Sequence, residues 1–524
     1  MTDEHIKKNM GVLMKGGLGA LAGTMAGTLM SFGTKVIITQ FSSPSVFGVF
    51  SLFLGIVSII YMLSTFGLSV GITRYIAFSS GKDDNTAVSN MVYSVMRMGI
   101  LISLVICVIA ISSADFIVKK IFPEVSHLGF LLKVTFITIP FFSLLDFSIG
   151  VARGFKDVKP KVFLLDIIKN LLFLLLLIIS IPISFSITSI TYSYAISVIV
   201  PGILSCIYIS NRYGVNLLKR PAYRAITVSK REFFLSSLPL TVMPLMWLVL
   251  GTMDTVMLGY FKKAEDVGIY NAAASLARFF NILISPITFI FLPVATQYMA
   301  KSSVYELSSL YKVTTKWIFS ISLPFFFLLI FFPEIMLVTL YGGDYAQGAL
   351  CLRIVVSGYL SSLILGINNV VLTASGKYVV QMWLSVSTIL LNLLLNILLI
   401  PKYGASGAAA ATAISYSSFN VLAAVVLYRH SAIHPFSVDF FKAIIAAVLT
   451  TVVFFILGRS ISVGYYSILP ILVLYCLSYL CCVILLFKGV TKSDSIIIDL
   501  IEQKSRLNLR YIKRFISRFG GDIE

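Results

Sequence analysis

The residues with the most evident chemical potential are charged side chains inside long apolar stretches of the sequence. Asp254, for example, lies in the apolar run that ends at Phe261. A charge at the centre of a bilayer costs roughly 2.5–3.5 kcal/mol or more, so such a residue usually marks a binding site or an ion pathway. Most of the others are cations. Cations on the walls of a site suit an anionic ligand, and guanidinium groups in particular suit phosphate.

These charges form two sets of candidate site residues. The substrate-binding set, a predicted cationic cavity, consists of Lys35, Arg74, Arg97, Lys133, Arg278 and Arg353. The set predicted for ion coupling or charge balance is Asp146 and Asp254. Two structural alternatives stay open for each charge: an ion pair within the protein, or a long side chain that reaches the headgroups. Asp166 and Lys169, three residues apart on one helix face, are expected to form such a structural pair.

The elements that carry these charges are expected to be membrane-spanning helices. Of the 524 residues, 58% are apolar and only 12% are charged, and the mean hydropathy is +0.96. A helix needs about 20 apolar residues to cross a bilayer, and a backbone in lipid must satisfy its own hydrogen bonds. The sequence therefore predicts an all-α polytopic membrane protein. About 14 spans are expected, at 12–41, 46–78, 87–111, 128–152, 160–180, 186–211, 233–260, 267–298, 306–332, 346–373, 378–400, 405–428, 438–458 and 464–488.

The chain contains an internal repeat. Residues 32–50 have the layout of 251–274, with Gly48 matching Gly268 and Lys35 close to the position of Asp254. A second match aligns Gly154, Asn170 and Ile181-Pro182 with Gly376, Asn392 and Ile400-Pro401, at separations of 222, 222 and 219. Two matches at nearly one offset indicate a duplicated unit. Because six spans per copy is an even number, the copies share one orientation, and we predict two parallel six-helix repeats around a central cleft.

The repeat also defines the predicted domains and pairs some of the buried charges. The domains are an N-lobe at 1–211, a basic linker at 212–232, a C-lobe at 233–430, two appended helices at 431–488, and a basic amphipathic tail at 489–524 that lies on the membrane surface. Lys133 and Arg353 are 220 residues apart, and Arg97 and Lys316 are 219 apart. The two residues of each pair are expected to lie at the same depth in the membrane. They would face each other across the central cleft if the helices that carry them line that cleft.

The distribution of Lys and Arg predicts the orientation. With the N-terminus inside, the inner segments hold 25 of these residues and the outer segments 6. Cytoplasmic segments carry the excess of basic residues, so both termini are expected on the cytoplasmic side of the cell membrane. The net charge of +19 then concerns anionic membrane lipids rather than nucleic acid. One short basic inner segment is RGFKDVKPK, from Arg153 to Lys161.

The sequence contains no recognisable catalytic site. There is no glycine-rich phosphate loop with its lysine and no metal-spaced set of His or Cys, and the six cysteines are interpreted as packing residues. No cofactor or metal is expected, and the protein is predicted to be a transporter rather than an enzyme. A membrane-embedded glycan polymerase or ligase would need a sizeable outer loop or clustered carboxylates. Neither is visible in the sequence.

Three motifs carry a family resemblance. GITRYIA at 71–77, MDTVMLGYF with VGIYNAAASL at 253–276, and LIPKYGASGAAAATA at 399–413 resemble prokaryotic polysaccharide transporters. These are the Wzx-type oligosaccharide flippases of the multidrug/oligosaccharidyl-lipid/polysaccharide (MOP) exporter superfamily. The resemblance covers nearly the whole chain. It implies that the protein moves a polyprenyl-phosphate- or pyrophosphate-linked oligosaccharide from the cytoplasmic to the outer leaflet by alternating access, for surface polysaccharide or glycan biosynthesis.

The same resemblance implies the partners. These are the lipid-linked oligosaccharide, membrane lipids, a proton or sodium ion for coupling, and other polysaccharide-assembly proteins. The nearest alternative is a drug or cation exporter of the same fold. Such an exporter is expected to place acidic residues in its cavity, whereas cations dominate here and Lys35 lies near the place that Asp254 has in the second copy.

Overall fold

The computed structural model of the chain describes residues 3–65, 67–79, 85–122, 128–213, 248–300, 303–460 and 468–482. Within these ranges the regular elements are helices, and ten of them are long and apolar enough to cross a membrane. The predicted all-α membrane fold is confirmed. The described residues do not establish a count of 14, because most of the seventh span, part of the fourteenth, nearly all of the linker and the C-terminal tail lie outside them.

The chain divides into two compact units. The first comprises Met1–Ala272 and Asn396–Ala408, and the second comprises Ala273–Leu395 and Ala409–Glu524. The lobe boundaries expected from the repeat stay a prediction.

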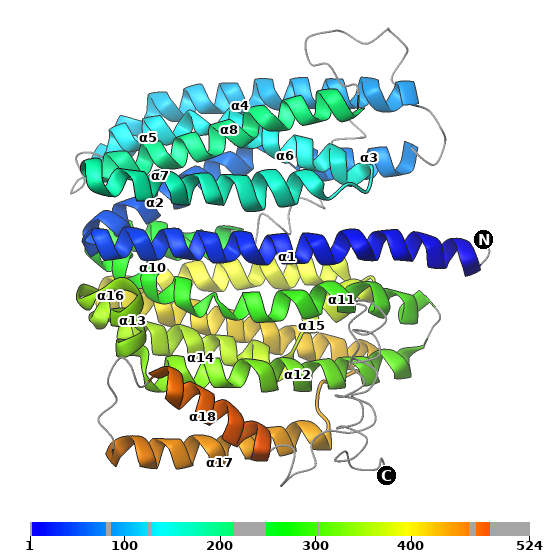
Figure 1. Cartoon of the computed structure of the whole chain (residues 1–524), viewed down its shortest axis with the longest axis vertical. Coiled ribbons are helices and arrows are strands. Elements are labelled where there is room, and N and C mark those ends of the chain that lie inside the picture. Colours follow the sequence, from blue (N-terminus) through cyan, green and yellow to red (C-terminus); the bar gives the residue numbers. More distant parts are fainter. Residues whose placement is uncertain are drawn as a thin grey trace. The chain divides into compact units, whose positions relative to one another are not determined.

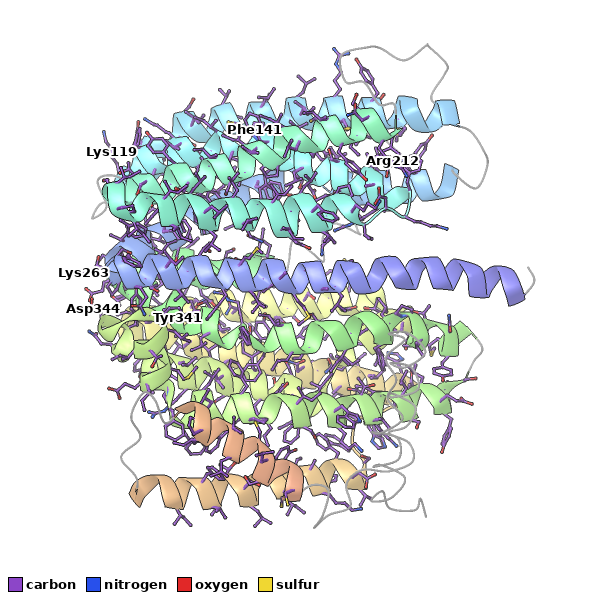
Figure 2. The ribbon with its side chains drawn as sticks, viewed as in Figure 1. Lys119, Phe141, Arg212, Lys263, Tyr341 and Asp344 are labelled. Atoms are coloured by element: carbon purple, nitrogen blue, oxygen red, sulfur yellow. The ribbon has the colours of Figure 1, made fainter. Side chains whose placement is uncertain are left out.

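The helices of the first unit form a bundle (Figure 1). In chain order they are α1 (Asp3–Phe41), α2 (Pro44–Thr65), α3 (Leu68–Ser79), α4 (Asn85–Ile121), α5 (Leu128–Phe136), α6 (Thr138–Gly154), the π-helix η2 (Lys161–Ile168), α7 (Lys169–Ser184), α8 (Ile187–Tyr213) and a short helix at Leu248–Phe261. Lys119 and Lys263 lie at one end of this unit and Arg212 at the other (Figure 2), as the predicted alternation of inner and outer segments requires. Which end faces the cytoplasm stays a prediction.

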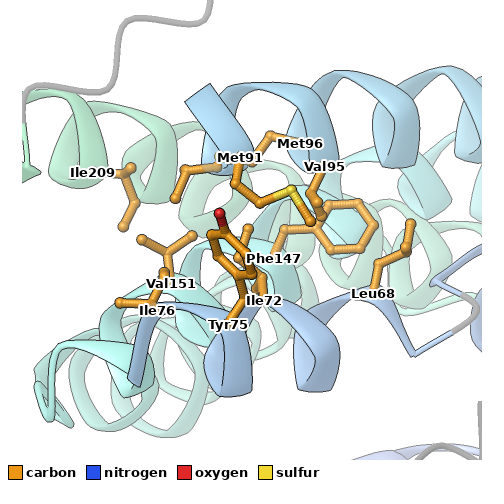
Figure 3. Close-up of a cluster of buried hydrophobic side chains, with 11 residues drawn as sticks. Leu68, Ile72, Tyr75, Ile76, Met91, Val95, Met96, Phe147, Val151 and Ile209 are labelled. Atoms are coloured by element: carbon orange, nitrogen blue, oxygen red, sulfur yellow. The ribbon is translucent and has the colours of Figure 1, made fainter. Parts of the chain in front are cut away.

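A buried apolar cluster joins α3, α4, α6 and α8 (Figure 3). Phe147 of α6 lies at its centre among Ile72, Met96 and Val151, and each of these four side chains is fully buried. Packing of this kind fixes where the neighbouring polar side chains point, because well-packed side chains have one low-energy arrangement.

The second unit is also helical. It contains α11 (Phe280–Ala300), α12 (Val304–Phe331), α13 (Pro333–Tyr341), the 3-10 helix η3 (Gly343–Gly348), α14 (Ala349–Leu365), α15 (Asn368–Ala374), α17 (Val438–Ser460) and α18 (Ile468–Cys481). Helices α10 (Ala264–Ala277) and α16 (Tyr378–Ser431) contribute residues to both units. Both late helices pack on Phe327 of α12. Tyr475 of α18 stacks on its ring with centroids 4.1 Å apart at 11°, and Phe454 of α17 meets it edge to face at 6.2 Å. Figure 1 shows α17 and α18 beside each other.

Several predicted spans are interrupted at glycines with left-handed backbone angles. The expected helix 46–78 breaks at Gly67 (φ 67°), and 346–373 breaks at Gly366 (φ 65°). The two spans expected at 378–400 and 405–428 are nearly continuous in α16, separated by the non-helical Gly404 (φ 55°). Only glycine adopts such angles at little steric cost, so a hydropathy pattern that ignores backbone geometry misplaces these boundaries.

Two details confirm the duplication at atomic level. First, Gly48 at the start of α2 packs against the backbone of Ala264 and Gly268, while Gly268 packs against Pro44 and Gly48. The two contacts are reciprocal because Pro44 and Ala264 are also 220 positions apart. All four residues belong to the first unit. A reciprocal contact of this kind is expected where a twofold relation passes between two elements.

Second, α6 and α15 end in the same Schellman motif. The backbone N–H groups of 155, 156 and 157 donate to the carbonyls of 151, 153 and 152, and those of 375, 376 and 377 donate to 371, 373 and 372. The left-handed position is Lys156 (φ 61°) in the first copy and Gly376 (φ 72°) in the second. The match of Gly154 with Gly376 was therefore wrong by two residues, since Gly376 corresponds to Lys156.

Candidate functional site

A cavity of about 280 Å³ lies inside the first unit. Its walls come from α1, α2, α6, α7, α8 and the start of the helix Leu248–Phe261. Two cations, Lys35 of α1 and Lys169 of α7, line it, and its described lining residues include no carboxylate. Hydroxyl and amide groups line it as well, from Ser31, Thr34, Ser58, Thr138 and Asn170. This combination suits an anionic ligand that also has hydroxyl groups.

Aromatic rings form much of the remaining wall. The Tyr61 and Phe142 rings meet edge to face with centroids 4.3 Å apart, and Phe50 and Phe173 stack at 6.0 Å. Lys169 Nζ lies 5.7 Å from the centroid of the Phe142 ring. The electron-rich face of an aromatic ring attracts a cation. The Phe142 ring therefore stabilises the Lys169 ammonium group inside the cavity.

The local chain geometry explains why Lys169 points into the cavity. Residues 161–168 form the π-helix η2. A π-helix is wider than an α-helix, so it rotates the direction in which the following side chains point. Asp166 pairs with Lys161 (Nζ to Oδ2, 3.2 Å) and accepts a 2.6 Å bond from the Thr24 hydroxyl. The expected ion pair between Asp166 and Lys169 is therefore wrong, because Lys161 takes that place. The sequence signal for Lys169 was its position in an apolar span, and it was assigned to the wrong partner.

Asp254 forms a separate buried polar centre in the first unit. Its side chain is 3% exposed. The Tyr270 hydroxyl donates to Oδ2 at 2.7 Å, and the Asn396 side-chain amide donates to Oδ1 at 2.7 Å. Both donors are neutral groups, and they satisfy the two carboxylate oxygens. The motif at 253–276 contains Asp254 and Tyr270, but Asn396 was missed because it lies about 140 residues away in α16.

The other predicted carboxylate, Asp146 of α6, lies behind Tyr61 and does not itself line the cavity. The hydroxyls of Tyr61 and Ser69 are its hydrogen-bonding neighbours, and the charge of Arg153 acts on it. Since Tyr61 also lines the cavity, Asp146 is one side chain removed from the space that Lys35 and Lys169 face.

Most of the predicted cations lie elsewhere. Lys133 pairs with Asp115 at 2.5 Å, and both side chains are largely exposed, at 38% and 58%. Arg353 is exposed and its Nε donates to the Ile330 carbonyl at 3.1 Å. Lys133 and Arg353 belong to different units, so their expected placement across a cleft stays a prediction.

The remaining three cations have different surroundings. Arg97 is exposed on α4, where it lines a pocket of about 340 Å³, while its expected counterpart Lys316 is only 6% exposed. Arg278 is half-buried at the break between α10 and α11, and its Nε donates to the Ala274 carbonyl at 3.2 Å. Arg74 lies in α3, and its side chain is outside the described part of the structure. Of the six predicted cavity cations, Lys35 is the one that the structure places in the lysine cavity of the first unit.

The architecture matches solved membrane transporters. A lipid II flippase MurJ in an inward closed conformation superimposes with a TM-score of 0.70 over 88% of this chain and 97% of its own, at 16% identity. An inward-facing multidrug resistance MATE family transporter of the MOP superfamily gives 0.64 over 79% and 98%, at 15% identity. At such identities the likeness concerns the fold alone. Among curated proteins, the probable low-salt glycan biosynthesis flippase Agl15 of Haloferax volcanii is 24% identical over 170 residues, 32% of this chain.

An uncharacterised membrane protein of Methanocaldococcus jannaschii is 26% identical over 172 residues, again 32% of this chain. The chain matches about a third of the length of these two relatives, 36% and 34%. The MatE family matches residues 239–398, and the family described as polysaccharide biosynthesis protein matches 13–299, more than half of the chain. The fold defines a multi-pass membrane protein. The chain belongs to the polysaccharide biosynthesis protein family, whose match covers more than half of it.

Proposed function

We propose that the protein is a flippase that moves a polyprenyl-phosphate- or pyrophosphate-linked oligosaccharide from the cytoplasmic to the outer leaflet of the cell membrane. The observation that supports this proposal most is the cavity that contains Lys35 and Lys169 together with hydroxyl, amide and aromatic groups. The lysines would bind the phosphate, the polar groups would bind sugar hydroxyls, and the aromatic rings would cover the apolar faces of the sugar rings. The polyprenyl chain would stay in the bilayer.

Transport requires the cavity to open to each side in turn. Two repeats in one orientation can supply this motion by rocking as lobes around the substrate. Asp254 is proposed to couple that motion to a proton or sodium ion, or to balance the lysines when the cavity is empty. Its burial, at 3% exposure, supports a role in which its charge state matters.

A test in the producing cell separates this function from a purely structural one. We expect the double substitution Lys35→Ala with Lys169→Ala to cause a phosphate-linked oligosaccharide lipid to accumulate on the cytoplasmic face, while membrane expression stays normal. The matched control is Lys119→Ala, which removes an exposed lysine at the end of the unit opposite Arg212 (Figure 2). Normal export of lipid-linked glycan in the double variant, at normal expression, would contradict the proposal.

A drug or cation exporter is the second candidate, because MATE transporters have the same fold and the MatE family matches 239–398. Two lysines in the cavity would repel a cationic drug, so this candidate fits the first unit less well. Resistance assays distinguish the two functions. Deletion of the gene should leave the sensitivity to cationic drugs unchanged if the cargo is a lipid-linked glycan.

A further inference from the structure

The turn that follows α6 carries a cluster of exposed cations, which we call the basic turn: Arg153, Lys156 and Lys159, together with Arg212 near the end of α8. All four side chains are exposed. Among the residues that the structure describes, none of the four forms an ion pair. Figure 2 places Arg212 at the end of the first unit opposite Lys119.

The turn is rigid because its single carboxylate is fully engaged. Asp157 accepts hydrogen bonds from the hydroxyls of Tyr208 (2.7 Å) and Tyr213 (3.0 Å) and from the backbone N–H of Lys159 (3.0 Å). Phe155 stacks on Tyr213 with centroids 4.5 Å apart at 12°. These contacts bring the end of α8, with Arg212, to the turn. The same contacts direct the Asp157 carboxylate toward Tyr208 and Tyr213. The outward face of the turn is therefore cationic.

Lys156 is held in an unfavourable backbone conformation. Its φ of 61° lies in the left-handed region, where a side chain is strained. The equivalent position of the second repeat has the same hydrogen bonds and contains Gly376 at φ 72°. Glycine therefore satisfies this turn without strain. The first repeat thus has a cationic side chain at a position where the second repeat has the less strained glycine.

The place of the basic turn in the membrane identifies the ligand chemistry. The turn joins two candidate spans, Gly129–Gly154 and Lys161–Ser184, so it lies at the level where lipid headgroups are found. We propose that the basic turn is a binding site for the phosphate of an anionic phospholipid headgroup. This site is separate from the lysine cavity, and the proposal does not depend on the flippase function.

Binding of a short-chain phospholipid to the purified full chain tests the proposal. The probes are dioctanoyl phosphatidylglycerol, its zwitterionic phosphatidylcholine analogue, and inorganic phosphate, each titrated against the protein in neutral detergent. We expect saturable binding of phosphatidylglycerol that is weakened about fivefold by Lys156→Gly and about fivefold by Arg212→Gln. The matched control Lys119→Gln removes one exposed lysine at the opposite end and should leave the Kd unchanged. Phosphatidylcholine should bind much more weakly.

Lys156→Gly also separates binding from folding. Since it relieves backbone strain, its Tm should equal or exceed that of the unaltered protein while its affinity for phosphatidylglycerol falls. Equal affinity in Lys156→Gly and the unaltered protein, or an equal loss in Lys119→Gln, would overturn the site. If inorganic phosphate binds with the same dependence on Lys156 and Arg212, a soluble phosphate is sufficient as the ligand, and the assignment to a lipid headgroup is overturned.

Discussion

Gly48 and Gly268 lie against each other in the first unit. Gly48 packs on the first residue of α10, Ala264, and Gly268 packs on the first residue of α2, Pro44. The two residues are 220 positions apart and occupy equivalent places in the repeat. The contact therefore joins the first copy to the second at the level of the backbone, at the beginnings of α2 and α10.

A methyl group at either glycine should disturb this crossing. A Cβ on Gly48 would overlap the Ala264 carbonyl, and one on Gly268 would overlap the Pro44 carbonyl. Because both obstacles are backbone atoms, relief requires a shift of the helices. We expect Gly48→Ala and Gly268→Ala each to lower the free energy of unfolding by about 1–3 kcal/mol, measured by denaturation in detergent. Gly33→Ala is the matched control, since nothing lies within 4 Å of a Cβ there. A Gly48→Ala variant as stable as Gly33→Ala would contradict the close crossing.

Asp254 is expected to combine a structural and a functional role, and two substitutions separate them. Asp254→Ala removes the acceptor of Tyr270 and Asn396 and should destabilise the protein by about 1–3 kcal/mol. Asp254→Asn keeps the shape and one oxygen, so it should be less destabilising while still abolishing ion-coupled transport. Thermal unfolding and transport under an imposed ion gradient measure the two effects. Full coupled transport by Asp254→Asn would exclude a coupling role for its charge.

The exposed pair of Lys133 and Asp115 allows a test of Lys133 as a cargo-binding residue. An exposed ion pair contributes about 0–1 kcal/mol, so Lys133→Ala and Asp115→Ala should both leave the stability nearly unchanged. If Lys133 contacts the anionic cargo, Lys133→Ala alone should reduce translocation. Equal rates in the two variants would assign Lys133 to the surface pair and remove it from the binding set.

The turn at Asp157 gives a prediction on pH. Partial burial disfavours the charged carboxylate, but hydrogen bonds from Tyr208, Lys159 N–H and Tyr213 outweigh it and lower the pKa of Asp157 below its ordinary value. A lowered folded-state pKa stabilises the protein above the unfolded pKa of about 3.9, and that contribution is lost as the pH falls through the folded value. Asp157→Asn should therefore be less stable than the unaltered protein at pH 7, with a difference that shrinks below about pH 4. A difference in Tm that is constant from pH 7 to pH 3 would contradict this.

The fold was predictable from the sequence because hydropathy and repeats are local or periodic signals. Gly48 and Gly268 identified the duplication correctly, and the structure confirms their register. The match at Gly154 failed because a Schellman motif is defined by backbone hydrogen bonds. The first copy has Lys156 where the second has Gly376, so the residue types conceal the equivalence.

The site was only partly predictable for a related physical reason. Depth in an apolar run identifies a costly charge, as for Lys35 and Asp254, but it does not say which way the side chain points. The π-helix η2 changes the direction in which the Lys169 side chain points. The hydrogen-bond donor Asn396 reaches Asp254 from a helix far along the sequence. Lys133 illustrates the opposite error, because its partner Asp115 lies on another helix, 18 residues earlier.

Translocation by purified protein in proteoliposomes tests the lysine cavity most directly. The cargo is a fluorescent polyprenyl-pyrophosphate oligosaccharide, and its arrival in the opposite leaflet is measured for the unaltered protein, Lys35→Ala, Lys169→Ala and the two Lys→Arg variants. A hydrogen bond to a charged group contributes about 1.5–3 kcal/mol, so each alanine substitution should slow translocation about 10–100-fold, and arginine should retain most of the rate. Alanine variants that fold normally and translocate this lipid at the unaltered rate would contradict the assignment of the cavity.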